Sequence, residues 1–223
     1  MKAKTHFFQF ALVLFITSCN SQQQQSELFD FGKVENGNYS NDFFGFNVTL
    51  PQEWYVQAKD SLVYKIKDMY KDKEFTGNSK NLQTSIEKTK PSTVNKAVLL
   101  TLFRYDIDSA VDLNYSFVVA ALNLKNDPQL KTGKDCINEI IKQSSSHEVK
   151  RTINGEPQLT KIGNKDFYEI TMEMEISEVT SGIVKQKYLS SVINNFNFSI
   201  ILTYSTDEQL KELNNILATA TFK

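Results

Sequence analysis

Residues 166–176, DFYEITMEMEI, alternate between apolar and polar side chains almost without exception. The apolar members would lie on one side of an extended chain: Tyr168, Ile170, Met172, Met174 and Ile176. The polar members would lie on the other: Glu169, Thr171, Glu173 and Glu175. Because successive side chains of a strand point to opposite faces, the pattern predicts a strand with one buried face and one acidic face. Lys185 and Lys187 in the next segment are expected to pair with these glutamates across the two strands.

Other segments also favour strands. Two nearly unbroken apolar runs, 97–103 and 117–122, are typical of central strands covered on both faces. Asn194-Asn195 predicts a turn into a strand in which Phe196, Phe198, Ile200, Leu202 and Tyr204 share a face. A short hairpin is expected from Tyr39 towards Pro51, and a last strand at 219–222.

Helical spacing of apolar residues appears in four places. Residues 60–72 place Leu62, Val63, Ile66, Met69 and Tyr70 at helical intervals, and a second short helix capped by Asn78 or Ser79 would end at Pro91. A third helix is predicted at 134–143, where Ile137, Ile140 and Ile141 share a face. Ser205 and Glu208 suggest a capping box for a final helix. Hairpin strands with helices on their flanks predict an α+β domain built on an antiparallel sheet.

The opening of this domain also resembles a known family. The stretch YSNDFFGFNVTLPQEW (39–54), the later IGNKDFYEI and the aromatic strand NNFNFSIILTYS are similar to PsbP-like domains, the group that includes bacterial DcrB-type lipoproteins. The resemblance implies a PsbP-like α/β/α sandwich over about residues 38–223. It also implies scaffolding or partner-binding roles, and it brings no catalytic residues with it.

The N-terminus has the pattern of a lipoprotein signal. Two lysines precede about ten apolar residues and then Thr17-Ser18-Cys19, which is the charged, apolar and small-residue order of a secretory signal. The apolar run is too short to span a bilayer, which takes roughly 20 residues. The sequence ITSC (16–19) resembles the lipobox, in which the cysteine is acylated on sulfur and becomes the mature N-terminus. The alternative is a plain signal peptide with an unrelated cysteine.

We therefore predict a signal peptide at 1–18, a polar tether at 19–37 and a PsbP-like domain at 38–223. The tether contains three apolar residues that are able to pack on the domain: Leu28, Phe29 and Phe31. Removal of residues 1–18, which hold two lysines and no acidic residue, leaves a net charge of about −3. That balance does not favour nucleic-acid binding. Only Cys136 remains after Cys19, so an internal disulfide is not expected if Cys19 carries lipid.

Candidate chemical residues are few. His147 is the only mature histidine and follows three serines, but no G-x-S-x-G motif accompanies it, so we expect a solvated residue. Cys136 is expected to be a buried core residue rather than a reactive thiol. No zinc motif or glycine-rich phosphate loop is found, and the acidic segment that starts at 106–112 lacks the Gly at position six and the Glu at position twelve of an EF-hand loop. We predict no catalytic residue, no metal and no cofactor.

Two tripeptides resemble a bacterial O-glycosylation acceptor, in which Asp precedes Ser and an apolar residue. They make Ser61 and Ser109 candidate attachment sites. Asp-Ser also begins helices as a cap, which is the structural alternative.

Taken together, these features predict a non-enzymatic module that is lipid-anchored in the bacterial envelope, preferentially at the outer membrane. It would bind an envelope protein or organise the membrane surface. A binder or sensor of a small apolar ligand between helix and sheet is the alternative, and it would show a large internal pocket. A hydrolase is the third hypothesis, and it would need a cleft joining His147 or Cys136 to a carboxylate.

Overall fold

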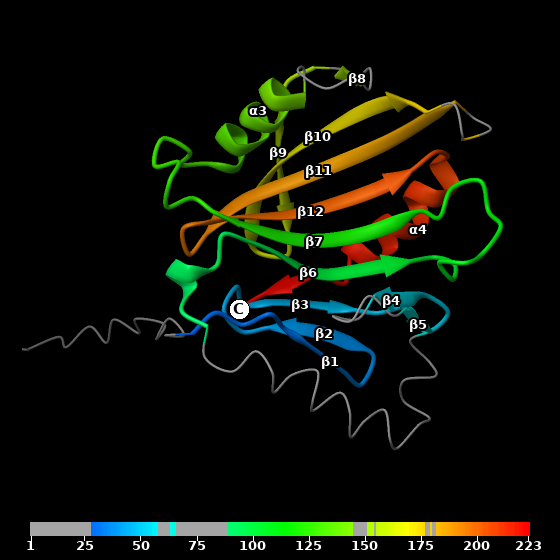
Figure 1. Ribbon diagram of the computed structural model, residues 1–223, viewed down its shortest axis with the longest axis horizontal. Helices are drawn as coiled ribbons and strands as arrows, with labels where there is room; N and C mark the ends of the chain where they lie inside the picture. Colours follow the sequence, from blue (N-terminus) through cyan, green and yellow to red (C-terminus); the bar gives the residue numbers. More distant parts are fainter. Residues whose placement is uncertain are drawn as a thin grey trace, which may run out of the picture.

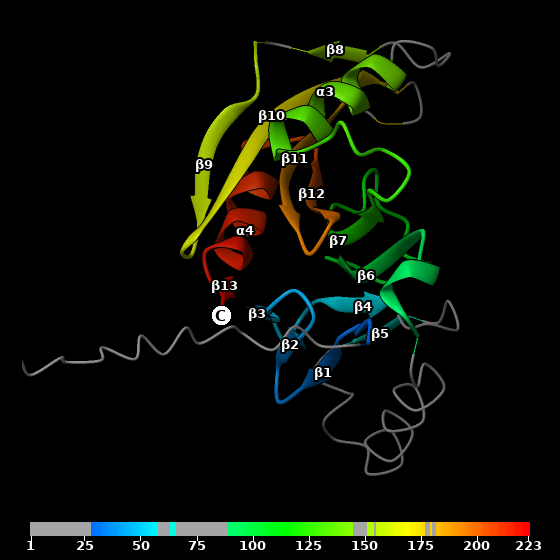
Figure 2. The same ribbon diagram turned by 90° about the vertical axis from the view of Figure 1, so that its left-hand side faces the viewer.

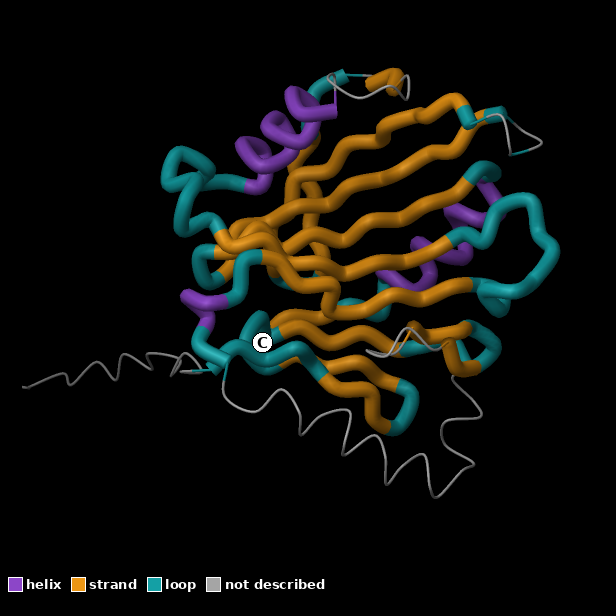
Figure 3. The backbone as a smooth tube through the Cα atoms, viewed as in Figure 1, coloured by secondary structure: helices purple, strands orange, loops and turns teal. Residues whose placement is uncertain are grey.

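The computed structural model describes residues 28–57, 63–65, 89–144, 151–153, 155–176, 179 and 182–223. These residues form two antiparallel sheets with α-helices packed against them (Figures 1 and 3). The smaller sheet has the strand order β1 (Lys33–Glu35), β2 (Asn38–Asn41), β3 (Phe46–Thr49) and β13 (Thr221–Phe222). The larger sheet has the order β5-β4-β6-β7-β12-β11-β10-β8, and β9 also pairs with β10. Its strands are β4 (Tyr55–Gln57), β5 (Val63–Lys65), β6 (Lys96–Phe103), β7 (Ser116–Asn123), β8 (Arg151–Ile153), β9 (Gln158–Ile162), β10 (Lys165–Glu175), β11 (Ile183–Ile193) and β12 (Phe196–Tyr204).

Helices lie on both faces of the larger sheet (Figure 2). The helix α3 (Gly133–Ser144) packs on β10 and β11, where Ile137 contacts Ile170 and Met172. The helix α4 (Asp207–Leu217) packs on the other face, against β12 and β3. A short 3₁₀ turn, η1 (Pro91–Thr93), leads into β6. The predicted class, α+β with an antiparallel sheet flanked by helices, is confirmed.

The alternating segment is β10, as predicted. Its apolar side turns towards α3, with Ile170, Met172 and Met174 buried. Its acidic side carries the expected cross-strand pairs: Lys187 Nζ lies 2.8 Å from a Glu169 oxygen, and Lys185 Nζ lies 3.7 Å from a Glu173 oxygen. The period-two pattern therefore determined both the strand and the partners of its charged face.

The two apolar runs form β6 and β7 in the middle of the larger sheet, but they are not covered on both faces. One face carries Leu102 and Phe117 into the main core. On the opposite face Val98 is 67% exposed and Leu122 is 44% exposed. The prediction of two covered faces is wrong because α3 lies over β10 and β11 rather than over β6 and β7 (Figure 1).

Residues 29–37, which the sequence assigns to the tether, pack against the domain in the described part of the chain. Phe29 is buried among aromatic rings, with its centroid 5.1 Å from that of Phe43 and 5.2 Å from that of Phe196. Its backbone N–H donates to the Thr89 carbonyl at 2.8 Å. The strand β1 then pairs with β2. Phe29 therefore docks on the domain, as the sequence allowed.

The structure corrects one helix and one cap. Residues 63–65, predicted to be helical, form β5 at the edge of the larger sheet, where Val56 of β4 pairs with Tyr64. The rest of that predicted helix, and the short helix predicted before Pro91, lie outside the described residues. In α4 the capping box is formed by Thr206 and Gln209 rather than by Ser205 and Glu208. The helix α3, the turn at Asn194-Asn195 and the last strand are confirmed.

The larger sheet has two ends that matter for function. Residues 89–95 enter β6 at its first end, where Phe29 is docked; we call this the entry end. The loop 104–115 leaves β6 at the opposite end, which we call the far end (Figure 1). Eight residues of β6 separate the two, or about 26 Å at the usual rise per strand residue.

Candidate interaction surface

Of the residues considered for chemistry or attachment, Cys136 and Ser109 lie in the described part of the chain. Cys19, Ser61 and His147 lie outside the described residues, so the lipid-attachment and glycosylation predictions at Cys19 and Ser61 stay predictions. Cys136 lies in the first turn of α3 and Ser109 lies in the far-end loop 104–115. In the described ranges, no group of three or more His, Cys, Asp or Glu side chains is placed to hold a metal ion.

Cys136 is a core residue, as predicted. Its side chain is buried where α3 meets β11, and the Ser190 hydroxyl is its polar neighbour. Burial raises the pKa of the thiol to about 11, which outweighs the hydrogen bond with Ser190 that favours the thiolate. A neutral, enclosed thiol is a poor nucleophile.

Ser109 lies in an ordered turn of the far-end loop and is partly exposed. Its backbone N–H donates to the Asp106 carbonyl at 3.1 Å, and its own carbonyl accepts from Val111 N at 2.9 Å. The Asp108-Ser109 pair therefore forms part of a turn rather than a helix cap. Glycosylation at Ser109 stays a prediction.

Asn114 holds the two limbs of this loop together. Its side-chain oxygen accepts from Tyr105 N at 3.0 Å, and its amide nitrogen donates to the carbonyls of Tyr105 at 2.9 Å and Asp106 at 3.2 Å. The Arg104 N–H donates to the Tyr115 carbonyl at 3.2 Å. A loop with this many internal hydrogen bonds presents its outer side chains in a defined arrangement.

Aromatic rings and an ion pair join the loop to the rest of the far end. The Tyr115 ring lies edge-on to Trp54 at 5.5 Å and to Tyr105 at 6.0 Å. Arg104 lies over the Tyr105 ring, and its Nε is 3.4 Å from a carboxylate oxygen of Glu212 on α4. Burial raises the pKa of Tyr115 well above its usual value, and the neighbouring Glu212 carboxylate raises it further. The ion pair between Arg104 and Glu212 thus connects the loop to α4.

Three apolar side chains of the loop face solvent. Ile107 is 56% exposed, Val111 is 38% exposed and Tyr105 is 36% exposed. We call these three residues, with the loop that carries them, the far-end surface. Exposed apolar side chains that gather on one loop are among the features that mark protein-binding sites. The sequence did not single out this surface, because the loop's fastening to Glu212 is a contact between distant positions.

A shallow pocket of about 280 Å³ lies beside the far-end surface. It is formed between the β3–β4 connection and α4, and its lining is Thr49, Pro51, Trp54, Glu212, Asn215, Ile216 and Thr219. The pocket opens to solvent and lies outside the space between α3 and the sheet. It does not have the enclosed form that a carrier of an apolar ligand needs.

Comparison with known proteins gives structural likeness only. No protein-family model and no curated protein matches the chain. The solution structure of cyanobacterial PsbP from Synechocystis is similar over 83% of this chain and 91% of that protein, with a TM-score of 0.48 and 9% identity. A protein from Bacteroides thetaiotaomicron is similar over 80% of this chain and 45% of its own length, with a TM-score of 0.39 and 13% identity. This chain therefore spans less than half of the second structure.

The architecture of the described residues agrees with the α+β class predicted from the sequence, in which helices flank an antiparallel sheet. Within these residues no helix has the length and apolar character needed to cross a bilayer.

Proposed function

We propose that this protein is a PsbP-like, DcrB-type lipoprotein of the bacterial envelope that binds a protein partner through its far-end surface and performs no catalysis. The observation that supports the proposal most directly is the far-end loop itself. Asn114 and the Arg104–Glu212 ion pair order the loop, and yet Ile107 is left 56% exposed. An ordered apolar projection of this kind lowers the entropy cost of binding, because little is left to be fixed when the partner arrives.

The charges around the exposed apolar residues of the loop indicate what kind of partner surface would be complementary. Asp106, Asp108 and Asp112 lie in the same loop as the exposed apolar residues, and the carboxylates of Asp108 and Asp112 are on the surface. A complementary partner presents an apolar recess bordered by lysine or arginine side chains. We expect that partner to be another envelope protein.

The anchor is the second part of the proposal. We infer from the lipobox-like ITSC that Cys19 is acylated through its sulfur and is the mature N-terminus, with the outer membrane as the location. Cys19→Ala should remove fatty-acid labelling in cells and leave an uncut or soluble product. Labelling that persists in this variant would refute the anchor.

Site-specific crosslinking tests the binding surface. A photoreactive amino acid at Ile107 should give a discrete larger adduct in cells, while the same group at Leu159, which is 61% exposed on β9, should not. The double variant Ile107→Asp/Val111→Asp should fold normally and lose the adduct formed from a probe at Tyr105. Equal adducts from Ile107 and Leu159, or an adduct that survives the double variant, would contradict the proposed surface.

A further inference from the structure

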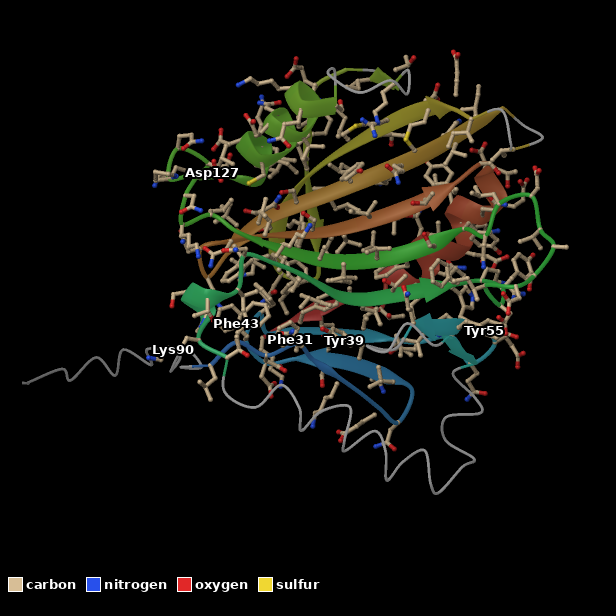
Figure 4. All side chains as sticks on the ribbon, in the orientation of Figure 1. Phe31, Tyr39, Phe43, Tyr55, Lys90 and Asp127 are labelled. Atoms are coloured by element: carbon tan, nitrogen blue, oxygen red, sulfur yellow. The ribbon has the colours of Figure 1, made fainter. Side chains whose placement is uncertain are left out.

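The described chain begins at the entry end of the domain, and its position there is fixed. Phe29 is held by the hydrogen bond to the Thr89 carbonyl and by its contact with the Phe43 ring. The Phe43 carbonyl in turn accepts a hydrogen bond from the Asn194 side chain in the β11–β12 turn. Figure 4 shows Phe31, Phe43 and Lys90 near one another at this end, and Tyr55 at the opposite end. The point at which the preceding residues are covalently joined to the described domain is therefore at the entry end.

The two ends of the sheet differ in charge. Exposed lysines occupy the entry end, on the segments that lead into β6 and out of β7: Lys90, Lys96, Lys125 and Lys131. Exposed carboxylates occupy the far end, on the segments that enter β4, leave β6 and β10, and begin α4: Glu53, Asp108, Asp112, Glu175, Asp207 and Glu208. The overall charge of −1 conceals this separation.

Hydrogen bonds join the two segments that carry the lysines of the entry end. Lys125 Nζ donates to the Ser92 carbonyl at 2.9 Å, which joins the segment after β7 to η1. The Asn123 side chain donates to the carbonyls of Pro91 and Val94, at 3.0 Å and 2.9 Å, so the same two segments are joined again beneath the surface. The exposed carboxylate of Asp42 at this end is paired with Lys223 at 3.6 Å, and those of Asp30, Asp127 and Asp135 are only partly exposed. We call Lys90, Lys96, Lys125 and Lys131 the lysine surface.

Covalent geometry limits how the domain can stand relative to its anchor. Cys19 and Leu28 are nine positions apart, so the chain between them spans at most about 32 Å. Placing the far end on the membrane would require this segment to run back along the roughly 26 Å of the sheet, almost fully extended. Placing the entry end on the membrane requires no such extension.

We infer that the domain stands with the lysine surface against anionic lipid head groups, so that the far-end surface points away from the membrane. This inference rests on the proposed acylation of Cys19. Positive charge at the entry end attracts anionic head groups and the acidic far end is repelled by them, and both effects act within a Debye length, about 8 Å at physiological salt. The orientation gives the far-end surface its access to a partner.

Lipid-to-label quenching tests this orientation. The lipidated full chain carrying Ser92→Cys or Ser109→Cys is labelled with a fluorophore and reconstituted on phosphatidylethanolamine–phosphatidylglycerol vesicles that contain nitroxide head-group lipids. Unsubstituted protein, whose Cys136 is buried, gives the background. The label at position 92 should be quenched at least threefold more than the label at position 109.

Charge variants test whether the lysine surface causes the orientation. Lys90→Gln/Lys96→Gln/Lys131→Gln should bring the quenching ratio towards one, as should vesicles without phosphatidylglycerol, whereas Lys211→Gln on α4 should leave the ratio unchanged. Flotation with the vesicles reports the anchor independently. If the protein floats with the vesicles but both labels are quenched equally, the inference is overturned and the anchor is not. The same holds if the lysine variants leave the quenching ratio unchanged. A chain that does not float would overturn both the inference and the proposed anchor.

Discussion

Cys136 illustrates at the scale of one residue how burial decides chemistry. The thiol is enclosed between α3 and β11, beside the polar group of Ser190, Asn197 and Ser199. There the Ser190 hydroxyl donates to the Asn197 side-chain oxygen at 2.7 Å, and the Ser199 hydroxyl donates to the same atom at 3.0 Å. The polar atoms satisfy one another, so the cluster stabilises the packing of α3 on the sheet.

The enclosed thiol should be nearly inert in the folded protein. With its pKa at about 11 rather than at 9.0, the thiolate fraction at pH 8 is about 100-fold lower than in the unfolded chain. We expect thiol reagents to modify Cys136 at least that much more slowly in buffer than in denaturant, followed by mass spectrometry. Fast modification of the native protein would show that the site opens to solvent.

Burial of the Cys136 thiol and the Tyr39 phenol should also make the stability of the fold decrease at alkaline pH. Because the folded-state pKa of Cys136 is raised, the protonated thiol contributes stability that is complete below about pH 9 and is lost as the pH rises towards 11. Burial raises the pKa of Tyr39 too, which adds a loss in the same direction at higher pH. Urea unfolding should show a falling free energy of unfolding above pH 9. The decline should be smaller in Cys136→Ala, and an equal decline in both proteins would contradict this assignment.

At the scale of one element, the close packing of α3 on the sheet depends on a glycine. The backbone of Gly133 approaches β11 so closely that an added Cβ would lie 2.0 Å from the Ser190 carbonyl oxygen and 2.6 Å from its carbon. Those atoms belong to the backbone of a strand paired on both sides, so they have little freedom to move. Ile137 and its neighbours on α3 then cover β10 from this fixed starting point.

Gly133→Ala should therefore lower the free energy of unfolding by about 2–3 kcal/mol, the usual cost of overpacking against a rigid neighbour. Lys134→Ala, one position along the same helix, should change it by less than about 0.5 kcal/mol. Urea unfolding followed by far-UV circular dichroism measures both variants. Equal stability of the two variants would mean that α3 is not held this closely to β11.

The elements also show which part of the structure local sequence determines. The strand β10 and the helix α3 were predictable because their apolar side chains repeat with a clear period. Residues 63–65 were not, since Val63 fits a helical spacing and a strand equally well and its pairing with β4 decides the outcome. The far-end surface had no local signal, because its loop is fastened by Glu212, far away in the sequence.

At the scale of the whole molecule, the chain is organised along the strands of its larger sheet. Phe29, near the start of the described chain, is docked at the entry end, where the lysine surface lies, and the ordered apolar loop projects at the far end. A module of this form acts by being held in place, because tethering raises its effective concentration near membrane partners. We therefore predict that function depends on the lipid anchor at Cys19 and on the far-end surface. It should not depend on the Cys136 thiol or on His147.

Complementation of a deletion strain tests this dependence most directly, with each variant matched for expression by immunoblot. In an assay where the deletion causes a defect, Cys19→Ala should reproduce much of that defect, while His147→Ala and Cys136→Ala should restore function almost as well as the unsubstituted protein. If the Cys19→Ala protein restored function and His147→Ala failed, the account of an anchored binding module would be contradicted, and a catalytic site would have to be sought around His147.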